Sequence, residues 1–138
     1  MTTAVKSRGI RNNNPGNIRK GKSKWQGLSD EQLDIEFCTF KTPQHGIRAL
    51  AIILKNYQRK YALNCIATII PRYAPSSENN TKAYIDSVAE KTGFGAMQHL
   101  DLSKPEVMKP LVKAVIHHEN GRNPYGDEII DQAIKMAL

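Results

Sequence analysis

The chain has few of the residues that mark a disulfide-rich, metal-binding or membrane-spanning protein. Only two of its 138 residues are cysteine, and Cys38 and Cys65 stand among apolar neighbours without metal-site spacing. We therefore expect reduced core cysteines and no metal site. No apolar run approaches the roughly 18 residues of a membrane span, and the start MTTAVKSRGIRNNN lacks the apolar stretch of a signal peptide. The sequence predicts neither a transmembrane segment nor a secretion signal.

Acidic residues are scarce relative to basic ones. Against 20 Lys and Arg there are 13 Asp and Glu, which gives a formal net charge of +7. Such an excess attracts polyanions over a distance that salt shortens. Nucleic acid, an anionic membrane surface and bacterial cell wall all fit, as does a face that only solubilises the protein. No helix-turn-helix, zinc-finger or RNA-binding signature accompanies the charge, so nucleic acid is the less favoured partner.

Length and continuity indicate one domain over residues 1–138. At this length one core can form, whereas two ordinary domains cannot. We expect residues 1–8 to be flexible. Residues 9–27 are rich in Asn, Gly, Arg and Lys, which favours turns over helix, and Phe37–Phe40 follows as part of a small hairpin. The predicted fold class is mainly α with a small β-hairpin.

Apolar periodicity and capping residues predict five helices. Thr42 followed by Pro43 is a typical helix start, Ser103 and Glu106 have the spacing of a capping box, and Gly121 supplies a left-handed stop. The expected helices cover about 43–61, 66–74, 80–93, 104–119 and 127–137.

Glu119, in the last turn of the 104–119 helix, is the leading candidate for a catalytic acid. It follows Ile116 by three residues and Val115 by four, so it lies on the apolar face of that helix. Burial and the negative end of the helix dipole both disfavour a charged carboxylate. A group that protonates a glycosidic oxygen near neutral pH requires such an environment. The alternative is a surface Glu paired with Arg122 or held by nearby backbone.

The string ENGRNPY, from Glu119 to Tyr125, resembles the lytic transglycosylase motif, in which a catalytic Glu, followed by Ser and two variable residues, precedes Asn-Pro. Asn120 stands where that family usually has Ser, which puts the hydrogen bonding around the Glu in question. The segments GIRNNNPGNIR, WQG, FCTFKTPQHGIRAL and RYAPSSENNTKAYI, within residues 9–85, resemble a family of phage and prophage virion proteins. This resemblance implies delivery in a virion beside other virion proteins, or passage from the host cytoplasm to the periplasm and cell wall.

The order of these segments points to a rearranged lysozyme-like fold. In lysozyme-like glucosaminidases the Glu-bearing helix comes first, and an Asn-rich turn, a Trp-x-Gly and an F-x-x-[FY] strand follow it. Here NPGNI, WQG and FCTF come first, and the Glu-bearing helix at 104–119 comes last. The resemblance therefore implies a lysozyme-like fold whose catalytic helix has moved to the C-terminal end, a circular permutation.

The remaining site candidates follow from the chemistry of glycan cleavage. A glycosidase of the usual kind needs a second carboxylate, for which Asp34 is preferred over Glu36, whereas a lytic transglycosylase needs only Glu119 because the muramyl 6-hydroxyl attacks internally. Amides pair with sugar hydroxyls and phenol rings stack on pyranose faces. The candidate substrate-binding residues are Asn14, Asn17, Tyr73, Asn80, Tyr84 and Tyr125. Turn chemistry for the asparagines and core packing for the tyrosines are the alternatives.

These observations favour cleavage of the bond between N-acetylmuramic acid (MurNAc) and N-acetylglucosamine (GlcNAc) in peptidoglycan. The enzyme would be a monomeric lytic transglycosylase or muramidase that uses no cofactor. The alternative is a basic phage structural protein that binds cell wall or nucleic acid without catalysis. The environment of Glu119 discriminates between them.

Overall fold

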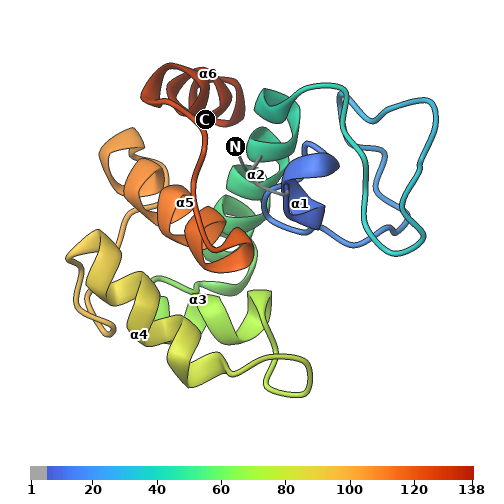
Figure 1. The fold of residues 1–138 in the computed structure, drawn as a ribbon. Coiled ribbons are helices and arrows are strands. Elements are labelled where there is room, and N and C mark those ends of the chain that lie inside the picture. The colour runs from blue at the N-terminus through green and yellow to red at the C-terminus, as the bar shows by residue number, and fades with distance from the viewer. Residues whose placement is uncertain (1–5) are drawn as a thin grey trace, which may run out of the picture.

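Six helices form the regular structure of residues 6–138, the part of the chain that the computed structural model describes (Figure 1). The predicted mainly helical class is confirmed. The helices are α1 (Arg8–Arg11), α2 (Pro43–Tyr61), α3 (Ile66–Tyr73), α4 (Thr81–Thr92), α5 (Pro105–Asn120) and α6 (Asp127–Ala137).

Most helix ends lie where the capping residues predict them. The Thr42 hydroxyl accepts a hydrogen bond from the backbone N–H of His45 at 3.2 Å and opens α2. Gly93 and Gly121 end α4 and α5 with φ of 77° and 75°, a conformation that favours glycine.

The predicted capping box before α5 is wrong. Lys104 is the N-cap residue of this helix and makes no side-chain capping bond. The Ser103 hydroxyl donates instead to Asp101 at 2.6 Å. An Asp two residues upstream therefore takes the hydroxyl that the pattern assigned to the helix start.

The predicted β-hairpin is replaced by a looser pairing. Residues 36–41 run antiparallel first to 18–20 and then to 27–29, with isolated bridges between Arg19 and Phe37 and between Leu28 and Phe40. No regular strand forms within residues 6–138. Because the 36–41 segment changes partner after three residues, neither pairing is long enough for a ladder.

The helix that carries Glu119 lies at the centre of the molecule. α5 contacts α1, α2, α4 and α6, and Figure 1 shows it between α4 and the N-terminal turn. Its fully buried side chains are Met108, Leu111, Val112, Val115 and Ile116. Burial of such side chains stabilises by roughly 1.5–3 kcal/mol each, so the position of α5, and with it that of Glu119, is strongly determined.

The N-terminal segment is attached to the rest of the molecule from Ser7 onward. Of the start that the sequence predicts to be flexible, residues 1–5 lie outside the described part of the chain, and Ser7 and Arg8 make side-chain contacts. The Ser7 hydroxyl caps α1 and Arg8 binds Asp34.

Cys38 and Cys65 are free and buried, as predicted. Among the described residues no helix has the length and apolarity that crossing a bilayer requires.

Candidate active site

Glu119 lies half-buried in the last turn of α5, one residue before the end of the helix. Both of its carboxylate oxygens accept a hydrogen bond. The Asn17 amide nitrogen lies 2.8 Å from Oε1, and the Tyr84 hydroxyl lies 2.9 Å from Oε2. Two neutral donors from the N-terminal turn and from α4 therefore fix the orientation of this carboxylate.

The turn that presents Asn17 is built around Asn14. The side chain of Asn14 is fully buried; its nitrogen donates to the carbonyls of Ile18 and Cys38 at 3.0 and 2.9 Å, and its oxygen accepts from the N–H of Ile18 at 2.9 Å. Asn17 has a φ of 51°, in the left-handed region that Asn tolerates. Asn14, predicted to bind substrate, instead holds the turn together, and turn chemistry explains it.

Asn120 joins the end of α5 to the same N-terminal turn. Its nitrogen donates to the carbonyl of Pro15 at 2.8 Å, and its oxygen accepts from the Ser7 hydroxyl at 2.6 Å. Gly9 completes the contact, because a Cβ there would lie 2.7 Å from the Asn120 oxygen and 2.8 Å from that of Asn17. The residue that replaces Ser in the transglycosylase-like motif thus bonds the turn and not Glu119.

Two phenols, one buried and one partly buried, lie near the carboxylate. Tyr84 is 1% exposed, and burial together with the charge of Glu119 raises its pKa far above the usual value, so this phenol stays protonated and acts as a donor. Tyr73, at the end of α3, donates to the carbonyl of Gly16, and burial and Glu119 also raise its pKa. The ring of His118 stacks on Tyr84 with centroids 3.8 Å apart.

A cleft of about 390 Å³ adjoins Glu119. Three predicted site residues line it: Asn17, Tyr73 and Glu119. Tyr84 does not line the cleft but donates a hydrogen bond to Glu119, which does. The cleft residues that the sequence reasoning missed come mainly from α2, α3 and the bridged segments: Arg19, Phe37, Ile53, Tyr57, Arg72 and Glu78. The sequence pattern gives little indication that these residues line a cleft. The apolar periodicity of α2, for example, assigns Tyr57 to the core.

Asp34, the candidate second carboxylate, does not line the cleft. Arg8 donates to it through Nε and Nη2 at 2.6 and 2.7 Å, and Asn12 and the N–H groups of Glu36 and Phe37 also donate to it. The Arg8 guanidinium holds the pKa of Asp34 well below its usual range. Asp34 is therefore an ionised anchor for the N-terminal segment.

The remaining carboxylates of this region are paired with arginine. Arg19 lies 3.2 Å from Glu36 and 3.5 Å from Glu78, which lines the cleft. Among residues 6–138, Glu119 has no cationic side chain within 4 Å. The alternative in which Glu119 pairs with Arg122 therefore does not hold.

Comparison with known proteins relates the chain to a phage protein. No family model matches the chain. Protein P5 of Pseudoalteromonas phage PM2 is 48% identical to it over 127 residues, which cover 89% of this chain and 78% of Protein P5. The chain belongs to the Protein P5 family. The predicted relationship to phage proteins is confirmed at this level.

Two further predicted site residues of this Protein P5 relative do not line the cleft. Asn80 is exposed and caps α4 by accepting from the N–H of Ala83 at 3.1 Å. Tyr125 is half-buried against the hydrophobic core, and its buried hydroxyl has no partner in the part of the chain that is described. Helix capping accounts for the position of Asn80, and core packing, the alternative stated for the tyrosines, accounts for that of Tyr125.

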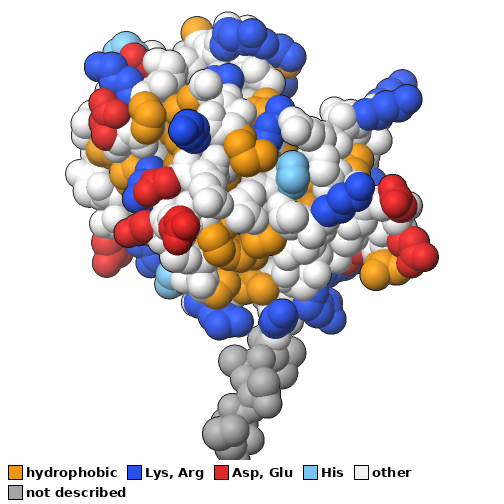
Figure 2. Space-filling view, turned by 90° about the horizontal axis from the view of Figure 1, so that it is seen from above, with side chains coloured by type: hydrophobic (Ala, Val, Ile, Leu, Met, Phe, Trp, Pro, Cys, Tyr) orange, Lys and Arg blue, Asp and Glu red, His pale blue; other side chains and the backbone are white. Residues whose placement is uncertain are grey.

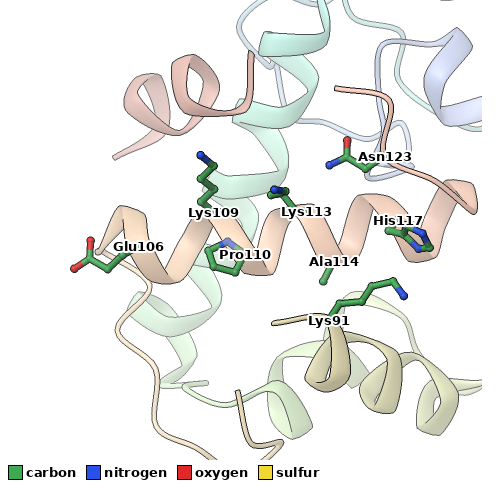
Figure 3. Close-up of a pocket in the computed structure, with 8 residues that line it drawn as sticks. All are labelled: Lys91, Glu106, Lys109, Pro110, Lys113, Ala114, His117 and Asn123. Atoms are coloured by element: carbon green, nitrogen blue, oxygen red, sulfur yellow. The ribbon is translucent and has the colours of Figure 1, made fainter. Parts of the chain in front are cut away.

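A second hollow, of about 510 Å³, lies along α5 beside α4 (Figure 3). Lys91 of α4 lines it, together with Lys109, Lys113 and His117 of α5. Lys109 lies 2.8 Å from Asp131, and Lys113 lies 3.3 Å from Asp127. Carboxylates of α6 neutralise two of its cations, and among residues 6–138 no hydrogen bond orients the side chain of Glu106 or His117, which also line it. The cleft beside Glu119 is therefore the better candidate active site.

Proposed function

We propose that this member of the Protein P5 family cleaves the MurNAc–GlcNAc bond of peptidoglycan, with Glu119 as the acid and base. The observation that carries the proposal is the contrast between Glu119 and its acidic neighbours. Asp34, Glu36 and Glu78 each pair with arginine, whereas Glu119 is oriented by two neutral donors beside a cleft. A carboxyl group that is not held in an ion pair is available to react with a ligand in the cleft.

The chemistry that needs only one carboxyl group is intramolecular transglycosylation. The Glu119 proton passes to the glycosidic oxygen as the bond from that oxygen to MurNAc C1 breaks. The Glu119 carboxylate then takes the proton of the muramyl 6-hydroxyl, whose oxygen bonds to C1. The products are a free GlcNAc 4-hydroxyl and a 1,6-anhydromuramyl end, no water is consumed, and Glu119 regains its proton. The ion-paired state of Asp34 favours this route over hydrolysis with two carboxylates.

The lining of the cleft suits a sugar strand. Phenol and phenyl rings of Tyr57, Tyr73 and Phe37 lie beside the amides of Asn17 and Asn79. Aromatic faces pack against pyranose C–H groups, and amides match hydroxyl groups because they both donate and accept. This mixture supports a carbohydrate ligand better than a purely apolar or a purely charged cleft would.

The position of the N-terminal turn supports a permuted lysozyme-like arrangement. Asn17 contacts Glu119 although 102 positions separate them. The segments that follow the catalytic helix in lysozyme-like glucosaminidases thus lie against the end of α5, which here comes late in the chain. We propose that the protein acts from the virion or during lysis, as its phage family suggests.

Purified peptidoglycan sacculi provide the test. We expect Glu119→Gln to lower the rate of glycan cleavage by about 100-fold or more, the range for loss of a general acid. Glu106→Gln is the matched control, because Glu106 is an exposed carboxylate in the first turn of the same helix. Circular dichroism must show both variants folded. Equal cleavage by folded Glu119→Gln and by the wild type would refute the proposed acid.

Mass spectrometry of the released muropeptides identifies the route. An anhydro end is lighter than a reducing end by one water, so transglycosylation predicts anhydro products only. Reducing ends would instead require a water molecule as nucleophile and a second group to activate it. That result would favour a muramidase and reopen the search for a second carboxylate.

The net charge of +7 supports a second candidate function, non-catalytic binding of wall or nucleic acid. In the view of Figure 2, Lys and Arg are spread around the edge of the face with Asp and Glu among them, not gathered in one patch. DNA binding predicts a mobility shift that weakens steeply with salt as counterions are released. A shift of this kind that Glu119→Gln leaves unchanged, without wall cleavage, would favour this function.

A further inference from the structure

Arg72 lies in the last turn of α3 and lines the same cleft as Glu119. Its guanidinium carbon is 3.7 Å from the centre of the Tyr61 ring and 5.5 Å from that of the Tyr57 ring. Cation–π contact with these two rings of α2 restrains the guanidinium group at the cleft. The side chain is exposed, so a ligand can reach it.

The two arginines of the cleft differ in their partners. Arg19 is bound by the carboxylates of Glu36 and Glu78. For Arg72 there is no carboxylate within 4 Å among residues 6–138. A guanidinium that stacks by its face leaves the N–H donors at its edge available, and their planar geometry fits a carboxylate bidentately.

We propose that Arg72 binds a carboxylate of the glycan substrate and selects carboxylated muramyl strands over neutral amino-sugar polymers. This inference rests on the proposed function, because it supplies the substrate recognition for the same cleft. Two sources offer the same chemistry. The muramyl lactyl group carries a free carboxylate when the peptide stem has been removed, whereas an intact strand carries carboxylates on the stem.

Binding measured by calorimetry separates the sources. Three probes are compared: glycan oligomers with intact stems, the same oligomers after amidase treatment, and chitin oligomers, which carry no carboxylate. We expect Arg72→Gln to weaken binding of at least one carboxylated probe by about 10- to 100-fold, the range for a hydrogen bond to a charged group, and to leave chitin binding unchanged. The affected probe identifies the source. Arg72→Lys keeps the charge without the bidentate geometry and is expected to recover only part of the affinity.

Arg59→Gln is the matched control, since Arg59 is an exposed arginine of α2 outside the cleft. Equal weakening of all three probes by Arg72→Gln would overturn the inference, as would no weakening or a wild type that binds neither carboxylated probe. Cleavage of sacculi is assayed in parallel. If the wild type cleaves sacculi normally and binding does not depend on Arg72, only the inference about Arg72 is refuted. If binding depends on Arg72 but no cleavage occurs, the proposed function is refuted and the carboxylate-binding site stands.

Discussion

Asn17 donates its amide hydrogen to the Glu119 carboxylate at 2.8 Å, across 102 positions of the chain. The contact joins the asparagine-rich turn near the N-terminus to the last turn of α5. Asn17 adopts a φ of 51° to do so, and its position is held by the buried amide of Asn14. The N-terminal turn is therefore part of the candidate active site, although the group by which it contacts Glu119 is a neutral amide.

Asn17→Gly tests this relationship directly. Glycine keeps the left-handed backbone at no steric cost and removes only the amide. Hydrogen bonds to charged groups contribute about 1.5–3 kcal/mol, so we expect cleavage of sacculi to slow by roughly 10- to 100-fold while the protein stays folded. Asn13→Gly is the control, because Asn13 also has a φ of 51° and its amide donates to the carbonyl of Phe40 and not to Glu119. An unaltered rate in Asn17→Gly would separate the turn from catalysis.

Tyr84→Phe removes the second donor to Glu119 and keeps the buried ring. Because burial and the nearby charge raise the pKa of Tyr84, its hydroxyl acts only as a hydrogen-bond donor, and activity should not show a pH dependence from its ionisation. We expect the rate to fall by roughly 10-fold or more. Steady-state kinetics on soluble glycan strands should place the loss in kcat more than in KM. Tyr125→Phe, at a half-buried tyrosine that neither lines the cleft nor donates to Glu119, should leave both constants unchanged.

Local signals in the sequence predict most of the fold. Thr42, Gly93 and Gly121 mark helix ends by their own conformational preferences, which need no distant partner. The capping box at Ser103 failed because Asp101 competes for the same hydroxyl. The predicted hairpin does not form because the 36–41 segment pairs with two different segments. Tertiary packing determines these pairings, and a local sequence pattern does not reveal them.

The candidate site is only partly predictable for a related reason. Residue type and motif identify Glu119, Asn17 and Tyr84 separately, but their contacts span 102 and 35 positions. The role of Asp34 depends on Arg8, 26 positions away, and that ion pair converts a candidate catalytic group into an anchor. Arg72 was missed because its significance lies in the stacked tyrosine of another helix.

Gly9→Ala tests the close packing of the N-terminal turn against α5. The added Cβ would lie 2.7–2.9 Å from the side-chain oxygens of Asn120 and Asn17 and from the carbonyl of Asn14. Overpacking of this kind costs about 1–3 kcal/mol. We expect the midpoint of urea unfolding to fall, and cleavage to slow because Asn17 must shift. Gly21→Ala meets no atom within 4 Å and should leave both measurements near the wild-type values.

The ion pair between Arg8 and Asp34 predicts how stability depends on pH. Because the pKa of Asp34 is lowered in the folded state, its contribution to the free energy of unfolding is complete above the unfolded-state pKa of roughly 4 and is lost as the pH falls toward the folded pKa. Asp34→Asn should therefore destabilise the protein at pH 7, and the difference from the wild type should shrink below about pH 4. Urea unfolding between pH 7 and pH 2 measures it. Asp30→Asn is the control, since Asp30 is exposed and forms no ion pair within 4 Å in residues 6–138. A pH-independent difference between Asp34→Asn and the wild type would mean that the carboxylate stabilises the N-terminal segment by its shape and not by its charge.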